Sequence, residues 1–177
     1  GSEMCIRDRA ERIRQILQQT GAEKVNIIAH SKGGLDCRYA ISEFGLAPYV
    51  ASLTTINTPH RGCIFAEKLL YAIPDKVKNK VAKAYNVTLT ALGDETPDFL
   101  AAVRDLTNEE CVKRNEMLTF PDGIYAQSVG SVMTRPRKGP FPFNLSHRYV
   151  KNYDGENDGL VGEHSFSFGE KYPLLRT

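Results

Sequence analysis

The feature that most constrains this chain is a serine placed between an apolar run and a segment with helical spacing, "VNIIAHSKGGL" at residues 25–35. Residues 25–29 are apolar and partly β-branched, which predicts a short strand buried on both faces. From Lys32 onward the apolar residues recur at helical spacing. The sequence therefore predicts a strand, a sharp turn at Ser31 and a helix.

Small residues flank this turn on both sides. Ala29 and Gly33 lie two positions before and after Ser31, which matches the nucleophile-elbow pattern G-x-S-x-G with alanine in place of the first glycine. We expect Ser31 to be strained and larger flanking side chains to clash with the strand and helix. The Lys32 backbone N–H would lie at a helix N-terminus, where it can donate to an oxyanion. The alternative is an ordinary turn in which Ser31 caps the helix.

The order of the remaining patterns predicts an α/β fold with a mostly parallel sheet flanked by helices. Helix and strand patterns alternate at residues 10–20, 25–29, 32–44, 50–57 and 63–72. Strand character returns at 123–133 and again at 171–175. Residues 74–119 show short helical patterns without a strand, and we interpret them as a helical cap or lid, with ordinary crossover helices as the alternative.

The first nine residues stand apart from these patterns. "GSEMCIRDR" has no apolar signal-peptide region and no strand or turn pattern. We interpret residues 1–9 as a non-native leader outside the fold, and residues 10–177 as one truncated domain. The helix at 10–20 is not preceded by the strand that its crossover requires, which indicates that the chain begins inside a domain.

Composition bounds the class of protein. The 177 residues are 41% hydrophobic and 25% charged, enough for a core in a single domain. A net charge of +2 gives no reason to expect nucleic acid as a partner, and no run approaches the roughly 20 apolar residues of a membrane span. The four cysteines are far apart, which argues against zinc. Cys37 and Cys63 are expected to be buried free thiols, which favours a reducing, cytoplasmic compartment.

A serine nucleophile needs a base and an acidic residue that orients it. Asp158, in "GENDGLV", is the expected acid, because it lies in a glycine-rich turn expected to follow a strand. Asp154 is the nearest competitor. Both also fit turn-forming aspartates, or a calcium-type loop in which Asp154, Glu156 and Asp158 alternate, although that loop lacks its closing glutamate.

The histidines give a weaker signal than the carboxylates. His164 is the only histidine after Asp158 and is therefore the candidate base. His30 directly precedes Ser31, and His60 follows the strand pattern at 50–57, so both are candidates to line the pocket. His147 is expected in a loop. For His30, His60 and His147, local hydrogen bonding or a surface position is the alternative interpretation.

Three segments in this order carry a family resemblance: "AHSKGG" at 29–34, "INTPHRG" at 56–62 and "NDGLV" at 157–161. Together they resemble bacterial triacylglycerol lipases and esterases of the α/β-hydrolase family. The resemblance implies Ser31 as nucleophile, the Lys32 N–H as oxyanion donor and Asp158 as acid. It also implies that residues 58–62 line the acyl side, that 74–119 is the lid, and that the substrate is a lipid or acyl ester. It implies no cofactor, although calcium occurs in some relatives.

Two parts of the family pattern are absent from this sequence: an early His-Gly oxyanion loop and a histidine after the last strand. We therefore expect an internal fragment of a longer lipase, with the base outside these residues and an exposed sheet edge. Two other functions stay open. One is a non-catalytic binding domain with the same fold, and the other is acyl transfer or amide hydrolysis through the same serine.

Overall fold

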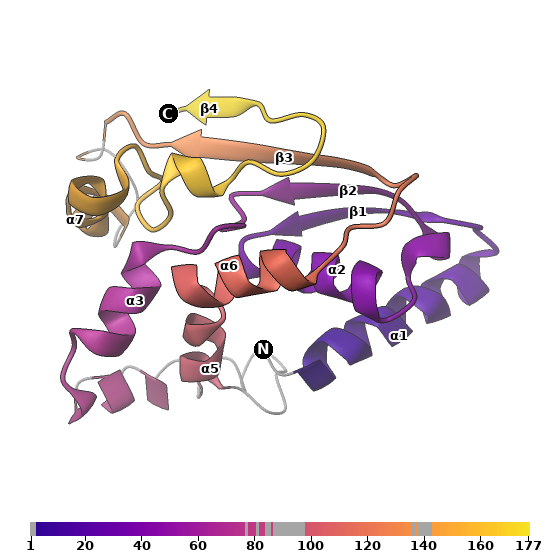
Figure 1. The fold of residues 1–177 in the computed structure, drawn as a ribbon, viewed down its shortest axis with the longest axis horizontal. Coiled ribbons are helices and arrows are strands. Elements are labelled where there is room, and N and C mark those ends of the chain that lie inside the picture. The colour runs from indigo at the N-terminus through magenta and orange to yellow at the C-terminus, as the bar shows by residue number, and fades with distance from the viewer. Residues whose placement is uncertain are drawn as a thin grey trace.

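A parallel sheet forms the centre of the computed structural model, which describes residues 3–76, 78–80, 82–83, 86, 98–135, 137 and 143–177. Within these residues the sheet has four strands in the order β1-β2-β3-β4 (Figure 1). Their bounds are Val25–His30, Val50–Ile56, Tyr125–Val132 and Leu174–Arg176. Every neighbouring pair is parallel, which confirms the predicted α/β class.

The register brings the strand ends to one edge of the sheet. His30 pairs with Ile56, and Ile56 pairs with Val129. The residues that follow β1 and β2, Ser31 and Asn57, therefore emerge side by side. In open parallel sheets this carboxyl edge is where ligands bind.

The described helices lie on one face of the sheet and beyond its carboxyl edge (Figure 1). In Figure 1, α1 and α2 lie together on one face, and α3 and α7 stand beyond the ends of the strand arrows. The described helices are α1 Glu3–Thr20, α2 Lys32–Glu43, α3 Ile64–Tyr71, α5 Phe99–Arg104, α6 Asn108–Met117 and α7 Phe143–Asp154. Two short 3-10 helices, η1 Ala47–Tyr49 and η3 Glu163–Ser165, complete the connections.

The first helix begins earlier than the sequence predicts. Residues 3–9, which we expected to lie outside the fold, are the start of α1. Ile6 is only 8% exposed and belongs to the same apolar cluster as Ile41 and Leu53. Arg9 forms an ion pair with the buried Asp36 of α2. The helix continues through this segment because one of its faces packs against the core.

The first strand differs from its prediction. Ala29 is buried, but Ile28 is 73% exposed, so β1 is not buried on both faces. In the described part of the chain β1 is the last strand on its side of the sheet. Helix α2 contacts β1, and α1 packs against α2. Apolar composition predicted a strand, but which faces are covered depends on neighbouring elements.

Helix α7 has no counterpart in the sequence prediction. Residues 144–152 were assigned no element, and His147 was expected in a loop; instead His147 is buried on α7, 5% exposed. Val150 of the same helix is completely buried. Because α7 runs to Asp154, Asp158 follows a helix rather than a strand. The apolar residues of α7 do lie on one helical face, so the periodic signal was present, and the mostly polar composition of the segment concealed it.

The predicted cap spans residues 74–119, of which 77, 81, 84–85 and 87–97 lie outside the described residues. Helices α5 and α6 fall within it, and α5 contacts α3. The cap therefore stays a prediction for the segment as a whole.

The thiols differ in part from the prediction. Cys63 and Cys111 are buried free thiols, whereas Cys37 is free but only partly buried. Burial raises the pKa of Cys63 to about 12, which keeps this thiol protonated and unreactive. None of the described helices is both long and apolar enough to cross a bilayer.

The residue after the turn that must lack a side chain is Gly34. A Cβ on Gly34 would lie 2.7 Å from Thr58 Cγ2 and nearer still to the Thr58 hydroxyl. A Cβ on Gly33, the glycine of the G-x-S-x-G pattern, would meet only Arg9 Nη1 at 3.7 Å. The expectation that Gly33 excludes larger side chains is therefore wrong in this structure, and the close approach is one residue later.

We expect Gly34→Ala to lower the free energy of unfolding by about 1–3 kcal/mol, because the added methyl overlaps Thr58. Gly33→Ala is the matched control. It should be neutral or raise stability by up to ~1 kcal/mol through helix propensity. Urea unfolding of both variants measures the difference, and equal stabilities would contradict this account of the turn.

Candidate active site

Ser31 occupies a turn that few residues other than glycine adopt. Its φ is 52° and its ψ is −132°, a region that costs a non-glycine residue about 1–3 kcal/mol. Its N–H donates to the Ile56 carbonyl at 2.9 Å, and its own carbonyl accepts from the Thr58 hydroxyl at 2.9 Å. The side chain makes no capping hydrogen bond to α2. The strained turn is therefore confirmed, and the capping alternative is wrong.

Lys32 begins α2 directly after the turn. Its N–H is one of the first four in the helix, which find no acceptor within the helix itself. This N–H therefore points out of the helix N-terminus beside Ser31, with the favourable end of the helix dipole behind it. The role of this N–H as an oxyanion donor stays a prediction.

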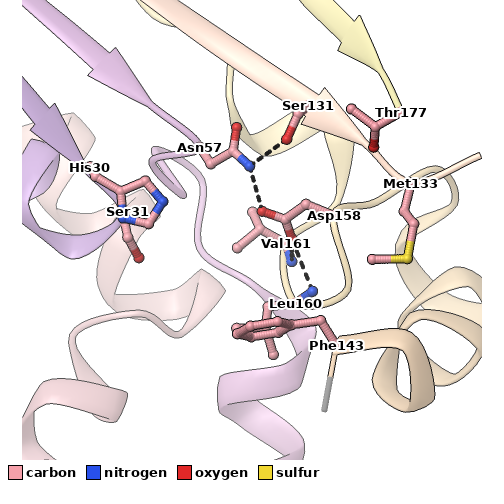
Figure 2. A pocket seen from close by; sticks show the side chains of 10 residues that line it. All are labelled: His30, Ser31, Asn57, Ser131, Met133, Phe143, Asp158, Leu160, Val161 and Thr177. Atoms are coloured by element: carbon pink, nitrogen blue, oxygen red, sulfur yellow. Dashed lines mark hydrogen bonds between the residues drawn. The ribbon is translucent and has the colours of Figure 1, made fainter. Parts of the chain in front are cut away.

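The Asp158 carboxylate is held by three hydrogen bonds. Its Oδ1 accepts from the backbone N–H groups of Leu160 and Val161, both at 2.9 Å. Its Oδ2 accepts from Asn57 Nδ2 at 2.8 Å. These bonds turn the carboxylate toward the end of β2 and fix its orientation (Figure 2).

The neighbouring acids have other partners. Asp154 Oδ2 accepts from the Ile64 N–H at 3.2 Å, at the start of α3, and Glu156 pairs with Arg176 at 2.8 Å. Because Asp154, Glu156 and Asp158 bond in three different places, they do not form the calcium-type loop considered from the sequence. Among the described residues no group of three or more histidine, cysteine or acidic side chains is arranged to hold a metal ion.

A cavity of about 300 Å³ joins the serine to this carboxylate. Ser31 and Asp158 lie on opposite walls, with Asn57 above the space between them (Figure 2). The cavity is lined by His30, Ser31, Asn57, Ser131, Met133, Phe143, Asp158, Leu160, Val161 and Thr177. The structure thus brings together the two residues to which the sequence analysis gave catalytic roles.

A second, apolar cavity of about 420 Å³ also reaches Ser31. It shares Phe143, Leu160 and Val161 with the first cavity, so the two meet at the serine. Its remaining wall comes from Pro59, the α3 and α5 regions and α7, through Cys63, Phe65, Ala66, Phe99, Val103, Leu106 and Ser146. Of the segment at 58–62, it is Pro59 that lines this cavity.

His60 lies in the core rather than in the pocket. It is 2% exposed and lines neither cavity that contains Ser31. Arg38 Nη1 lies 3.0 Å from Nδ1, and Thr55 Oγ1 lies 3.0 Å from Nε2. Because arginine can only donate, Nδ1 is the acceptor and Nε2 carries the proton. Burial, with Arg38 and Arg61 nearby, lowers the pKa of His60 to about 2, so the ring is neutral.

The other histidines do not bridge Ser31 and Asp158. His30 lines the cavity, as expected, but it is the residue before Ser31 on the same strand. His164, the candidate base, is exposed on η3 and lines neither cavity that contains Ser31. His147 is buried on α7. The structure therefore does not bring His164 to the serine.

Asn57 and Ser131 line the cavity but were not singled out from the sequence. Asn57 directly follows the strand after the elbow, and Ser131 lies near the end of the next one. In a parallel sheet, polar residues at consecutive strand ends meet at one edge. That pattern was the available signal.

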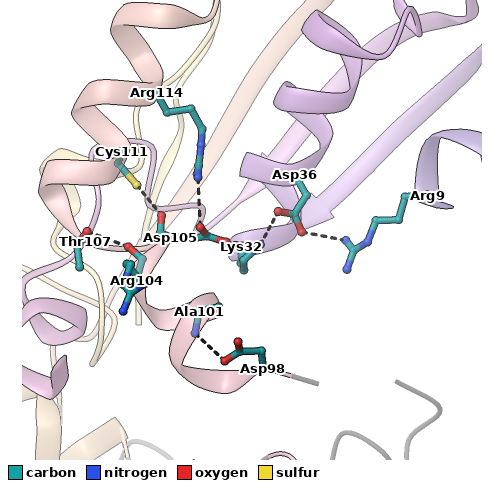
Figure 3. Close-up of polar contacts among 10 residues, drawn as sticks. All are labelled: Arg9, Lys32, Asp36, Asp98, Ala101, Arg104, Asp105, Thr107, Cys111 and Arg114. Atoms are coloured by element: carbon teal, nitrogen blue, oxygen red, sulfur yellow. Dashed lines mark hydrogen bonds and ion pairs between the residues drawn. The ribbon is translucent and has the colours of Figure 1, made fainter. Parts of the chain in front are cut away.

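An ion-pair network connects α2, the helix that follows Ser31, to α6 and to the connection between α5 and α6 (Figure 3). Lys32 Nζ lies 2.6 Å from Asp36 Oδ1 and 3.3 Å from Asp105 Oδ2. Arg114 of α6 lies 3.4 Å from the other oxygen of Asp105. Burial would lower the pKa of Lys32, but these two carboxylates outweigh burial and raise it. The network holds the α5–α6 connection beside the residue that follows the serine.

A family model described as the alpha/beta hydrolase fold matches residues 2–160. The chain belongs to this family. Two triacylglycerol lipases, from Pseudarthrobacter phenanthrenivorans and Burkholderia plantarii, are each 43% identical over 117 residues, or 62% of this chain. The match covers 35% and 31% of those two relatives, so the chain spans about a third of their length.

Two solved structures share the fold at lower identity. A Bacillus licheniformis lipase in its mature form has a TM-score of 0.65 and 22% identity, over 94% of this chain and 63% of that one. A metagenomic carboxyl esterase has a TM-score of 0.68 and 16% identity, over 94% of this chain and 48% of that one. These likenesses support the α/β-hydrolase architecture.

The strain at the turn predicts that Ser31→Gly will be more stable than Ser31→Ala by about 1 kcal/mol. Glycine releases the strain of the positive φ, at a smaller cost in unfolded-state entropy. Neither variant has the hydroxyl, so their difference reports the backbone alone. Urea unfolding measures it, and an alanine variant as stable as the glycine variant would contradict the strain.

The ion-pair network predicts an acid-dependent contribution to stability. Burial would raise the pKa of Asp105, but neighbouring cations, Lys32 and Arg114 among them, outweigh it and lower that pKa below its ordinary 3.8. Because the pKa of Asp105 is lower in the folded protein than in the unfolded chain, its charged form stabilises the fold at pH values above the unfolded-state pKa. This contribution is lost as the pH falls through the folded-state pKa. Asp105→Asn should therefore cost a few tenths to about 1 kcal/mol above pH ~5. The difference should shrink toward zero by pH ~2, and a pH-independent difference in urea unfolding would contradict this.

Proposed function

We propose that this protein is a serine-dependent carboxylic ester hydrolase of the lipase and esterase type. One observation carries the proposal: Ser31 is held in a strained turn, its hydroxyl caps no helix, and it lines two cavities at once. One cavity contains the oriented carboxylate of Asp158, and the other is apolar. Relatives named triacylglycerol lipase, 43% identical, support the same assignment.

The proposed reaction proceeds in two steps through an acyl-enzyme. Ser31 Oγ forms a bond to the ester carbonyl carbon while its proton passes to a general base. The carbonyl oxygen becomes an oxyanion that accepts from the Lys32 N–H, a type of contact worth about 2.7–4 kcal/mol. The intermediate expels the alcohol, which takes the proton from the base. Water then attacks the acyl-enzyme in the same way, which releases the carboxylic acid and restores the serine.

The base is proposed to be a histidine outside the four in this sequence, as the family resemblance implies. Its ring would enter the cavity of about 300 Å³ between Ser31 and Asp158. There one ring nitrogen would take the serine proton, and the other would donate to the Asp158 carboxylate. The acid would fix the tautomer of the ring and stabilise its charged form.

The apolar cavity suits an acyl chain as the substrate group. Phe65, Phe99, Val103 and Leu106 line it, and its volume is about 420 Å³. Burying each methylene of a chain there contributes about 0.8 kcal/mol. We therefore propose lipid esters as the substrate class. The α5 residues in this wall also support the cap proposal for residues 74–119.

Labelling by a fluorophosphonate probe tests the proposal, using the protein as encoded in its gene. We expect Ser31 to be labelled and nitrophenyl esters to be hydrolysed, with both lost in Ser31→Ala. Asp158→Asn should lower kcat by about 10⁴-fold, because the base would lose its orientation. Asp154→Asn is the matched control, since an asparagine oxygen can still accept from the Ile64 N–H, and it should stay near wild type.

Three outcomes separate the alternatives. A folded protein without labelling or hydrolysis would favour the non-catalytic binding domain. Labelling with acyl transfer to added alcohols, or with amide cleavage, as the faster reaction would favour the other chemistries of the same serine. Loss of activity in Asp154→Asn but not in Asp158→Asn would overturn the choice of acid.

A further inference from the structure

Asn57 occupies a backbone conformation that does not by itself require an amide side chain. Its φ is 46°, in the left-handed region, where glycine is the residue without steric cost and asparagine is tolerated. Its N–H donates to the Val129 carbonyl at 2.9 Å, so the backbone is fixed against β3. Glycine or aspartate could also adopt this turn, so the backbone conformation alone does not select the amide.

Both hydrogens of the amide are used, and both point to residues of the cavity. Asn57 Nδ2 donates to Ser131 Oγ at 2.7 Å and to Asp158 Oδ2 at 2.8 Å. A carboxylate only accepts, so the amide nitrogen must face Asp158. Ser131, on β3, anchors the second hydrogen and prevents the amide from rotating away (Figure 2).

Asp158 therefore has a donor from outside its own loop. Its Oδ1 accepts from Leu160 and Val161, which follow it directly in sequence. Asn57 is the partner at the edge of the sheet, because it directly follows β2, the neighbour of the strand that precedes Ser31. The bond thus links the carboxylate to the sheet edge that carries the serine.

We infer that Asn57 is a positioning residue, whose amide sets the Asp158 carboxylate at a fixed place and angle relative to Ser31. This inference rests on the proposed function, because it assigns Asn57 a role through the triad acid. Asn57 does not line the apolar cavity, so the acyl chain would not contact it. Its effect falls on the orientation of the base, and hence on the chemical step rather than on substrate binding.

Two variants separate this role from that of a turn residue. Asn57→Gly keeps the positive φ without strain and removes only the amide. Asn57→Asp keeps the shape and tolerates the same φ, but it places a second carboxylate against Asp158. We expect kcat for a nitrophenyl ester to fall about 10-fold in Asn57→Gly and further in Asn57→Asp, with KM within about 2-fold of wild type.

A residue that only shaped the turn would give a different order. The kcat of Asn57→Gly would then equal or exceed that of the wild type, and the kcat of Asn57→Asp would match it. A folded Asn57→Gly or Asn57→Asp protein with kcat within 2-fold of wild type, alongside an inactive Asp158→Asn protein, overturns the positioning role alone. A fully active Asp158→Asn protein overturns the choice of acid and this inference with it, whereas a wild-type protein without esterase activity overturns the proposed function as well. Urea unfolding of each variant establishes that it is folded.

Discussion

The hydrogen bond from the Ser31 N–H to the Ile56 carbonyl is the contact on which the site depends. This bond extends the pairing of β1 with β2 by one residue, so the position where the sharp turn begins is fixed relative to the carboxyl edge of the sheet. Thr58 then folds back and donates to the Ser31 carbonyl. Gly34 leaves the space for that threonine. The position of the serine is therefore set as much by β2 and the residues after it as by its own segment.

The residues after β2 are themselves held by buried polar contacts. His60 lies between Arg38 and Thr55 and stacks on Phe168 with the ring centroids 4.7 Å apart. Its backbone N–H donates to the carbonyl of Ser165, which is also buried. Buried polar groups are costly unless they are paired, so these bonds together allow one arrangement of the segment. A neutral histidine serves here as a structural link between α2 and the sheet, and its ring does not reach the serine.

Several elements could be predicted because their signals are local. The strand, turn and helix around Ser31 follow from apolar spacing and small residues. The parallel direction of the strands follows from the alternation of strand and helix patterns. Asp158 was singled out as the candidate acid from its glycine-rich segment, and the structure places it on the same cavity as Ser31. Helix α7 and the start of α1 were missed although both helices are amphipathic, because their mean composition is polar and the apolar residues that pack on the core are few.

The sequence alone determined that Ser31 would lie in a strained turn with its hydroxyl free of a helix cap, because backbone geometry and steric limits act within a few residues. It also determined that the strands run parallel, which follows from the alternation of strand and helix patterns along the chain. Only the tertiary structure decided that Gly34 rather than Gly33 needs to be small, that His60 and His164 lie away from the serine, and that Asn57 reaches Asp158. Each of these depends on which distant segments lie side by side, and residues 57 and 158 meet only when the sheet and the segment after α7 are folded together.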